Sequence, residues 1–292
     1  MKVKYGKMLG IDEDNRLITI KSQNRIKQVY LPRSLFLKFL PTLIIGDYLV
    51  YTLKHPKKKK YPYADYLSDI TRIIKIQRKV PKVLYSHDVI QNQLTSFINS
   101  IETKMFLDLE MSMHPYNYDK DFVQEIIQVG YILVDANNTI IEEYTNFIQP
   151  KLHKALTKRT LKFLDLSQED VDQGISFLTF YDHFKQVVEK HHPAIIVWGK
   201  NDELALKEAY KIYQVTPVNH SRFVNLLNLH KTFYRLKDDL GLLNAYKLYQ
   251  NEALNQRHDA LDDALMTKAI FDGFKRVLNK KYKSEKLKNS KT

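Results

Sequence analysis

The sequence predicts an α/β chain in two parts, with an all-β amino-terminal part followed by a layered α/β domain. Short runs rich in Val, Ile, Leu and Tyr, separated by turn residues, fill residues 1–80. Strand-like and helix-like segments then alternate through residues 103–278. The chain has 292 residues and is 44% hydrophobic, which is enough to give each part a buried core.

The composition excludes several kinds of protein. Cysteine is absent, so disulfide scaffolds, thiolate zinc sites and thiol nucleophiles are ruled out. The amino terminus has no apolar run, and the longest apolar region, residues 35–51, is interrupted by Lys38, Pro41 and Gly46. We therefore expect neither a secretory signal nor a membrane span, and we expect a cytoplasmic protein.

Positive charge is concentrated outside the α/β domain. The formal net charge is +13, yet residues 95–278 carry 21 basic and 25 acidic residues. Residues 1–94 carry 19 basic and 7 acidic residues, and residues 279–292 carry 6 and 1. This split predicts a polyanionic partner for the basic parts, most often nucleic acid, and a separate role such as metal binding for the acidic middle.

The amino-terminal part has the element order of an OB-type barrel. Strands are predicted at residues 3–11, 17–21, 26–31, 48–53 and 69–76, with one or two helical turns at residues 34–40. Five strands with a short helix after the third is the OB order. We expect an OB-type nucleic-acid-binding module at residues 1–80, a connector at residues 81–102 and a frayed or disordered basic tail at residues 279–292.

The module also resembles the cold-shock family of OB folds. The resemblance rests on VYLPRSLF at residues 29–36 and on Gly46-Asp47 before the fourth strand. It implies that Tyr30 stacks on a base, while Pro32 stands where the family has a histidine. The second predicted strand, RLITIKS, lacks the glycine-and-aromatic motif of that family.

A lysine- and tyrosine-rich loop lies between the fourth and fifth predicted strands, where OB folds often contact oligonucleotides. Its lysines supply charge for phosphates and its tyrosines offer flat faces for unstacked bases. These candidate substrate-binding residues are Lys57, Lys58, Lys59, Lys60, Tyr61 and Tyr63. The alternative is a solvated charge run with two core-facing tyrosines. We favour binding because the loop position and the aromatic residues coincide.

The α/β domain alternates strands and helices. Strands are predicted at residues 105–111, 126–134, 139–148 and 195–198, and helices at residues 177–190, 202–213 and 260–278. In the first strand, Asp108 and Glu110 are two apart and share one face, while Leu107 and Leu109 face the core. Two buried carboxylates on one face repel each other unless a cation such as Mg²⁺ or Mn²⁺ neutralises them. The alternative is a strand end with both acids in solvent.

Two further places carry candidate polar groups. Asp202 follows an apolar strand and the turn at Gly199, so it is either a functional acid or an ordinary helix N-cap. His258 precedes a helix-forming run in which Asp262 and Asp263 follow four and five residues later. Either acid can share part of a helical face with the histidine. The alternative for His258 is a surface or capping residue.

Together these segments resemble the DEDDh family of 3′–5′ exonucleases, over roughly residues 103–275. Asp108-Leu109-Glu110 matches its first motif, VWGKND at residues 197–202 its second, and HDALDDA at residues 258–264 its third. The histidine-to-aspartate spacing of the family selects Asp263 over Asp262. EIIQVGYILVD at residues 125–135 resembles its second strand, and the insert before that strand is closest to the Eri-like subgroup.

The resemblance implies an RNase H-like fold and a two-metal phosphodiester hydrolase. Two ions, Mg²⁺ or Mn²⁺, would be held by Asp108, Glu110, Asp202 and Asp263, with His258 as the general base. The product would be a nucleoside 5′-monophosphate from the 3′ end of single-stranded RNA or DNA. Met111 would lie against the terminal base or sugar, although many family members have threonines at Met111-Ser112.

Three readings of function follow. The first is an active exonuclease that the OB-type module supplies with single strands, with RNA favoured over DNA. The second is a catalytically silent nucleic-acid-binding protein that keeps the fold. The third is a DNA-trimming repair exonuclease. The presence of all five motif residues favours an active enzyme, and the Eri-like and cold-shock-like resemblances favour RNA.

Overall fold

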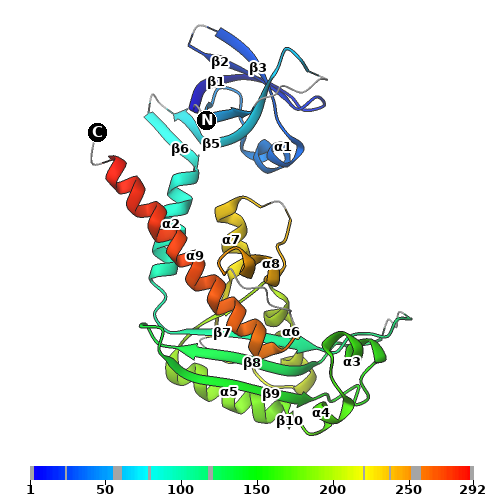
Figure 1. Cartoon of the computed structure of the whole chain (residues 1–292). Helices are drawn as coiled ribbons and strands as arrows, with labels where there is room; N and C mark the ends of the chain where they lie inside the picture. The colour runs from blue at the N-terminus through cyan, green and yellow to red at the C-terminus, as the bar shows by residue number, and fades with distance from the viewer. Residues whose placement is uncertain are drawn as a thin grey trace. The chain divides into compact units, whose positions relative to one another are not determined.

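The protein forms two compact units, Met1–Gln93 and Leu94–Thr292, each with its own hydrophobic core (Figure 1). The computed structural model describes residues 3–23, 25–54, 61–77, 80–117, 121–219, 221–236, 238–250 and 258–289, with side chains as far as residue 280. The division falls inside the stretch expected to be a connector. Within the described ranges, no helix is both long and apolar enough to cross a bilayer.

The first unit is a closed barrel of five strands. They are β1 (Val3–Asp12), β2 (Leu17–Ser22), β3 (Arg25–Tyr30), β4 (Tyr48–Lys54) and β5 (Asp65–Gln77). β1 pairs antiparallel with β2 and β4, β5 pairs antiparallel with β4, and a parallel pairing of β3 with β5 closes the barrel. The short helices α1 (Arg33–Phe39) and η1 (Leu40–Thr42) lie between β3 and β4. This topology confirms the expected OB-type module.

Alternating residues of the strands fill the barrel. Leu49, Tyr51 and Leu53 of β4 are buried, while the residues between them are more exposed. Phe36 and Phe39 of α1 join the same core. The sequence did not predict β6 (Val80–Ser86), which pairs with β5 at the edge of the sheet, because Pro81 argues against a strand; an edge position tolerates proline.

The second unit is built on a mixed six-stranded sheet. Its strands are β7 (Lys104–Met111), β8 (Ile126–Val134), β9 (Ile140–Gln149), β10 (Ile175–Ser176), β11 (Ala194–Val197) and β12 (Arg222–Asn225). Their order is β10-β9-β8-β7-β11-β12. β8 runs antiparallel to both β7 and β9, whereas β11 runs parallel to both β7 and β12.

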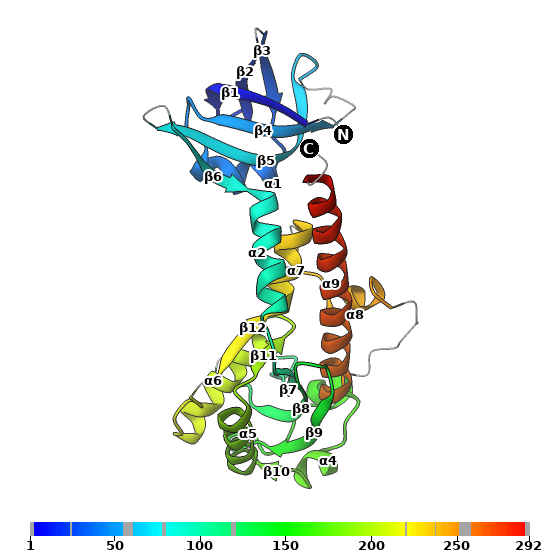
Figure 2. The same ribbon diagram turned by 90° about the vertical axis from the view of Figure 1, so that its left-hand side faces the viewer.

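Helices cover both faces of this sheet (Figure 2). The helices of this unit are α2 (His87–Asn99), which begins in the first unit, α3 (Lys158–Leu164), α4 (Gln168–Asp172), α5 (Phe177–His191), α6 (Asn201–Tyr213), α7 (Leu226–Tyr234), α8 (Leu242–Lys247) and α9 (Ala260–Asn289). α5 and α6 form one core with the odd-numbered residues of β7. α9 crosses the opposite face, where Phe271 meets Phe106 edge-on with ring centroids 5.5 Å apart. The arrangement confirms the expected RNase H-like fold.

The carboxyl-terminal region differs from the expectation. Residues 279–292 were expected to be frayed or disordered, but α9 continues to Asn289. Ile270, Phe274 and Leu278 are buried and anchor the helix. Once a helix is nucleated, lysine-rich sequence propagates it readily because lysine has a high helix propensity.

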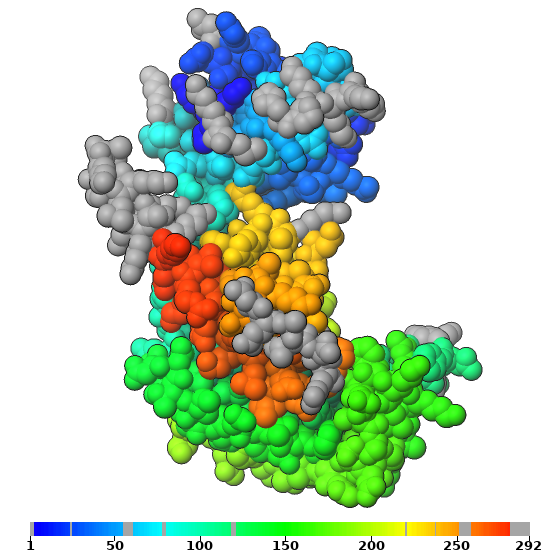
Figure 3. Space-filling model, in the orientation of Figure 1, coloured from blue at the N-terminus to red at the C-terminus, as the bar shows by residue number. Residues whose placement is uncertain are grey.

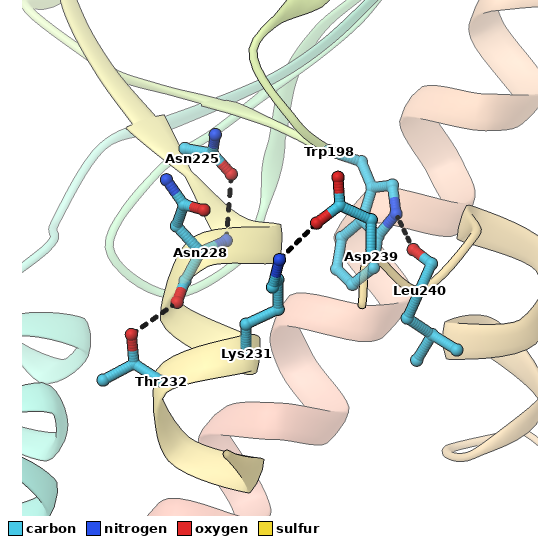
Figure 4. A network of polar contacts seen from close by, with 7 residues as sticks. All are labelled: Trp198, Asn225, Asn228, Lys231, Thr232, Asp239 and Leu240. Carbon is cyan, nitrogen blue, oxygen red and sulfur yellow. Dashed lines mark hydrogen bonds and ion pairs between the residues drawn. The ribbon is translucent and has the colours of Figure 1, made fainter. Parts of the chain in front are cut away.

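α7 and α8 pack beside α9, where Phe233 of α7 meets Phe274, and neither helix was predicted from the sequence (Figure 3). Figure 4 shows how the segment before α8 is attached. The indole Nε1 of Trp198, just after β11, donates to the carbonyl of Leu240 at 2.9 Å, and Lys231 of α7 forms an ion pair with Asp239. These contacts connect the end of β11 to α7 and to the start of α8.

Candidate active site

Asp108 and Glu110 project from β7 toward the face that α9 covers. Leu107 and Leu109, which alternate with them, belong to the core on the opposite face. On the neighbouring strand β8, Gly130 pairs with Asp108 and Gln128 pairs with Glu110. The expected alternation is therefore present, and the two acids are partly buried near the end of β7.

Asp202 reaches the same strand from α6. The parallel pairing of β11 with β7 ends at Ile196 and Phe106, after which the chain turns at Gly199, whose φ of +110° favours glycine. The Asp202 side chain is buried, and its Oδ1 accepts the backbone N–H of Leu109 at 3.0 Å. The helix cap is Lys200, so Asp202 is not an N-cap. Its carboxylate takes the place of a strand partner for Leu109 beyond the end of the β11 pairing.

His258 and Asp263 arrive from the start of α9. One potential ligand atom from each of Glu110, His258 and Asp263 lies within 4.8 Å of the other two. Asp263 is buried, whereas Asp262 is exposed, so the structure brings Asp263 into the group and leaves Asp262 outside it. His258 has a φ of +52°, and its ring centroid lies 4.6 Å from that of Phe163 on α3.

The four acids, Asp108, Glu110, Asp202 and Asp263, form an acidic cluster, in which the pKa values of Asp108, Glu110 and Asp202 are raised. Burial, and then the charges of Asp202 and Glu110, raise the pKa of Asp108 well above its usual range. Burial, then Asp263 and Asp202, raise the pKa of Glu110 to about 8. Burial raises the pKa of Asp202 to about 6, although the hydrogen bond from Leu109 opposes the shift.

The acidic cluster fits a site for hard divalent cations. All four side chains offer carboxylate oxygens, which are the ligands that Mg²⁺ and Mn²⁺ prefer. Crowded, buried carboxylates favour either protons or metal ions, and the raised pKa values report that competition. A strongly perturbed cluster of this kind on the central strand of a sheet is a candidate catalytic centre.

A groove of about 1140 Å³ runs along α6, and its lining residues include neither the four acids nor His258. Met111, directly after the first motif, lines it together with Asn201, the residue before Asp202. Phe122 and Gln124 from the segment before β8, and Leu204 and other residues of α6, complete its walls. Met111 and Asn201 thus border the groove as the sequence neighbours of Glu110 and Asp202, and Met111 also packs against the core on the α5 and α6 side of the sheet.

The OB-type module places its aromatic candidates differently from the expectation. Tyr30 and Tyr61 are only 2% and 8% exposed, and their rings stack on each other at 5.4 Å. Both belong to a small core with Leu17 and Ala64. Their ring faces are therefore covered, which favours the core-packing alternative for these two residues over base stacking.

Of the two candidate tyrosines in the loop, Tyr63 remains accessible, because it is 61% exposed. It meets Tyr61 edge-on at 6.1 Å. The lysines of the loop, Lys57, Lys58, Lys59 and Lys60, lie outside the described residues.

Sequence reasoning missed three residues that position this site. Gln128 and Gly130 of β8 contact the start of α9, and Asp259 caps that helix. A Cβ on Gly130 would lie 2.2 Å from the backbone nitrogen of Leu261, so only glycine lets α9 approach this closely. A glycine inside a strand that is apolar apart from Gln128 was the available signal for such a close approach.

A mixed sheet of this order with an acidic cluster on its central strand defines a nuclease of the RNase H-like class. The chain belongs to the exonuclease (RNase_T) family, whose model matches residues 105–271. It is 29% identical over 168 residues to the probable 3′–5′ exonuclease KapD of Bacillus subtilis, covering 57% of this chain and 82% of that protein. It is 25% identical over 184 residues to the 3′–5′ exonuclease crn-4 of Caenorhabditis elegans, covering 56% and 60%.

Solved structures share the fold of the second unit. The nuclease domain of 3′hExo, a DEDDh family member bound to rAMP, superposes with a TM-score of 0.51 and 16% identity, covering 62% of this chain and 94% of that one. The structure of CRN-4, the cell-death related nuclease 4, has a TM-score of 0.50 and 21% identity, covering 61% and 64%. Family, relatives and fold together make this chain a 3′–5′ exonuclease.

Proposed function

We propose that the protein is a metal-dependent exonuclease that removes nucleoside 5′-monophosphates from the 3′ end of single-stranded nucleic acid, with RNA preferred over DNA. One observation carries the proposal. Four carboxylates and a histidine, from three sequence segments more than 50 residues apart, converge on one face of β7 in a chain of the exonuclease family. Four carboxylates held this close repel one another unless cations neutralise them, which supports a metal site.

In this proposal Asp108, Glu110, Asp202 and Asp263 hold two divalent ions. When bound, the ions supply an activated water for attack on phosphorus and stabilise negative charge on the leaving 3′-oxygen. Asp202 also fixes the edge of β7 through Leu109, so the first motif and α6 keep a constant separation. The carboxylate-only donor set supports Mg²⁺ or Mn²⁺.

His258 is the proposed general base. Imidazole is the side chain that most often serves as a general base, because a ring nitrogen can accept a proton from water. Phe163, which is half-exposed, lies against the imidazole ring and limits its rotation. The histidine belongs to the turn directly before α9, and its placement therefore depends on where that helix begins.

The 3′-terminal nucleotide would bind in the groove beside Met111. The groove has apolar walls from Met111, Phe122 and Leu204, and polar groups from Asn201 and Gln124. Such a mixture suits a sugar and base next to a phosphate held at the acidic cluster. Residues that contact the terminal nucleotide decide how well ribose is distinguished from deoxyribose.

The OB-type module is proposed to hold the strand upstream of the scissile bond. Residues 1–94 carry an excess of 12 positive charges, and Tyr63 offers an exposed ring beside the lysine loop. RNA is preferred in this proposal because of the resemblance to cold-shock and Eri-like proteins. The solved 3′-exonuclease that recognises a histone mRNA stem-loop shares this fold at a TM-score of 0.52, which is consistent with that preference.

The proposal is tested with RNA and DNA strands of one sequence, labelled at the 5′ end and incubated with Mg²⁺, Mn²⁺ or chelator. We expect a ladder that shortens from the 3′ end, forms faster on RNA, and disappears with chelator. Faster degradation of DNA would favour the DNA-trimming alternative. Binding of both strands without any degradation would favour the silent binding protein.

A further inference from the structure

We propose that Gln128 is a positioning residue for catalysis, because it fixes the point at which α9 begins and thereby sets His258 and Asp263 against Glu110. The inference rests on the proposed function. Gln128 lies on β8 directly opposite Glu110 in the antiparallel pairing with β7. Its side chain turns to the start of α9, 131 residues further along the chain.

Gln128 makes two hydrogen bonds to the start of α9. Its Nε2 donates to Oδ2 of Asp259 at 2.7 Å, and its Oε1 accepts the backbone N–H of Ala260 at 3.3 Å. The residue is only 2% exposed, so both bonds form where water competes little. One buried amide therefore binds the side chain of one residue and the backbone of the next.

The two hydrogen-bond partners of residue 128 require an amide side chain at that position. The N–H of Ala260 can only donate, and the ionised carboxylate of Asp259 can only accept. Glutamine offers one acceptor and one donor on neighbouring atoms, which satisfies both partners at once. A carboxylate at position 128 would face Asp259 with no proton to share, and an apolar side chain would leave both partners unsatisfied.

Asp259 connects Gln128 to the proposed catalytic residues, because it forms hydrogen bonds with the first turn of α9. Its Oδ1 accepts the N–H groups of Leu261 and Asp262 at 3.0 and 3.2 Å, as an N-cap does. Its carbonyl accepts the N–H of Asp263 at 2.9 Å. His258 is the residue immediately before it in the chain. The Gln128–Asp259 pair therefore fixes the two ends of the His258–Asp263 turn together.

The Gln128–Asp259 pair also adds a restraint that the close contact between α9 and β8 does not provide. At Gly130 the backbone of Ala260 and Leu261 lies so close that no Cβ fits. That close contact sets the distance between the helix and the strand, but a glycine cannot fix the rotation or the sliding of the helix. The directional hydrogen bonds of Gln128 supply that missing restraint.

Exchanging the hydrogen-bond donor and acceptor between residues 128 and 259 distinguishes an effect of helix position from an effect of charge. In Gln128→Glu two carboxylates face each other, and in Asp259→Asn two amide donors face each other, so each change breaks the pair. The double variant Gln128→Glu/Asp259→Asn restores the side-chain pair with donor and acceptor exchanged, and it keeps the net charge of the wild type. Asparagine is also a good N-cap, so the start of α9 keeps its cap.

The readouts are the Kd for Mn²⁺ without substrate, measured by titration calorimetry, and the kcat and KM on a short 5′-labelled RNA. We expect each single variant to weaken Mn²⁺ binding and to lower kcat about 10- to 100-fold, the range typical of groups that orient metal ligands. The double variant should return to within about threefold of the wild type, because its hydrogen bonds are restored. KM should change less than kcat.

Two results would overturn the inference. If Gln128→Glu strengthened Mn²⁺ binding while Asp259→Asn weakened it, the effect would be that of charge alone. If the double variant were no better than the product of the single effects, the pair would not act as a unit. Should Gln128→Glu fail to fold, Asp259→Ser keeps a capping hydroxyl but cannot reach Gln128, and wild-type activity in that variant would also contradict the inference.

Failure of the inference is distinguishable from failure of the proposed function. A wild-type protein that neither binds Mn²⁺ nor shortens RNA would refute the proposed function. A wild-type protein that does both, beside a Gln128→Glu variant that matches it, would refute only the positioning role.

Discussion

The side chain of Asp202 accepts a hydrogen bond from the backbone N–H of Leu109, across 3.0 Å and between segments 93 residues apart. Leu109 stands between Asp108 and Glu110, so this bond connects the second motif to the centre of the first. Asp202 therefore has a structural task, as the acceptor for β7, and a chemical task, as one of four carboxylates. The two tasks can be separated because only the second needs charge.

Replacing Asp202 with asparagine should abolish activity and preserve the fold. The amide oxygen still accepts from Leu109, while loss of one negative charge relieves repulsion in the cluster. We expect kcat to fall at least about 100-fold, with a melting temperature at or above that of the wild type in chelator. Asp202→Ala, the matched control, should lose activity and also stability, because it leaves the Leu109 N–H unsatisfied. A stable, active Asp202→Asn variant would contradict the proposed role.

A methyl group at Gly130 should displace the start of α9. The Cβ would meet the backbone of Leu261 and Ala260 at 2.2 and 2.3 Å, and backbone atoms cannot rotate away. Overpacking of this kind costs about 1–3 kcal/mol, so Gly130→Ala should lower the free energy of unfolding by that amount and weaken Mn²⁺ binding. Urea denaturation and calorimetry measure the two effects.

Gly241→Ala is the matched control for that change. Gly241 has φ of −62°, and a Cβ there meets nothing within 4 Å. We expect wild-type stability and activity for this variant. If the two substitutions lowered stability and activity equally, the close approach of α9 to β8 would not be the reason that position 130 requires glycine.

The free energy of unfolding should decrease at lower pH, because His230 is buried in its neutral form. This side chain is buried among Trp198, Tyr249 and Phe274, its Nε2 hydrogen-bonds to the Tyr249 hydroxyl, and burial lowers its pKa to about 4. The unfolded chain takes up the proton near pH 6.5, so stability from the neutral ring is fully present above that pH and is lost toward pH 4. The shift corresponds to a loss of about 3 kcal/mol.

Urea denaturation at pH 7, 6, 5 and 4 measures this loss. His230→Gln has no group that titrates in this range at position 230, so its free energy of unfolding should depend less on pH between 6.5 and 4. Its stability at pH 7 should be lower, because the glutamine fills the aromatic pocket poorly. An unchanged pH dependence in His230→Gln would assign the effect to another group.

The tyrosines of the OB-type module should separate into structural and surface residues. Tyr30 stacks on Tyr61 in a buried cluster, so Tyr30→Ala should destabilise the barrel by about 3–5 kcal/mol. Tyr63→Ala should leave stability unchanged, because that ring is exposed, and should weaken binding of long RNA.

Binding of a dinucleotide is the control for Tyr63, since so short a ligand is expected to occupy only the groove beside Met111. Weakening of long and short ligands by the same factor would mean that Tyr63 does not extend the binding surface. Replacing Lys57–Lys60 with neutral residues should lower the salt dependence of long-strand binding, by close to one unit of slope for each phosphate that a lysine no longer neutralises.

The sequence was sufficient where periodicity and chain order carry the information. Alternation in β7 placed Asp108 and Glu110 on one face, and the motif order predicted the RNase H-like fold. It was insufficient where a contact joins distant segments. Asp202 was predicted as a metal ligand from its motif, but its hydrogen bond with Leu109, 93 residues earlier, could not be predicted. Asp259 and Gln128, 131 residues apart, gave no signal as a pair.

The sequence also did not predict which tyrosines of the barrel are exposed, and the reason is different. Tyr30, Tyr61 and Tyr63 have the same chemistry and similar neighbours in the chain, yet two are buried and one is exposed. Which ring faces the core depends on how β3 closes onto β5, a pairing between strands separated by more than 30 residues. Composition predicted a nucleic-acid-binding module, but only the closed barrel could assign individual tyrosines to its surface.

The most direct test of the account follows the product of one RNA strand labelled in its 3′-terminal nucleotide, with wild-type protein and with Asp108→Asn. The account predicts that the wild type releases labelled nucleoside 5′-monophosphate as the first product when Mn²⁺ or Mg²⁺ is present. Chelator or Asp108→Asn should stop the release while the protein stays folded. Release of labelled oligonucleotides or of a nucleoside 3′-monophosphate, or equal release by Asp108→Asn, would contradict it.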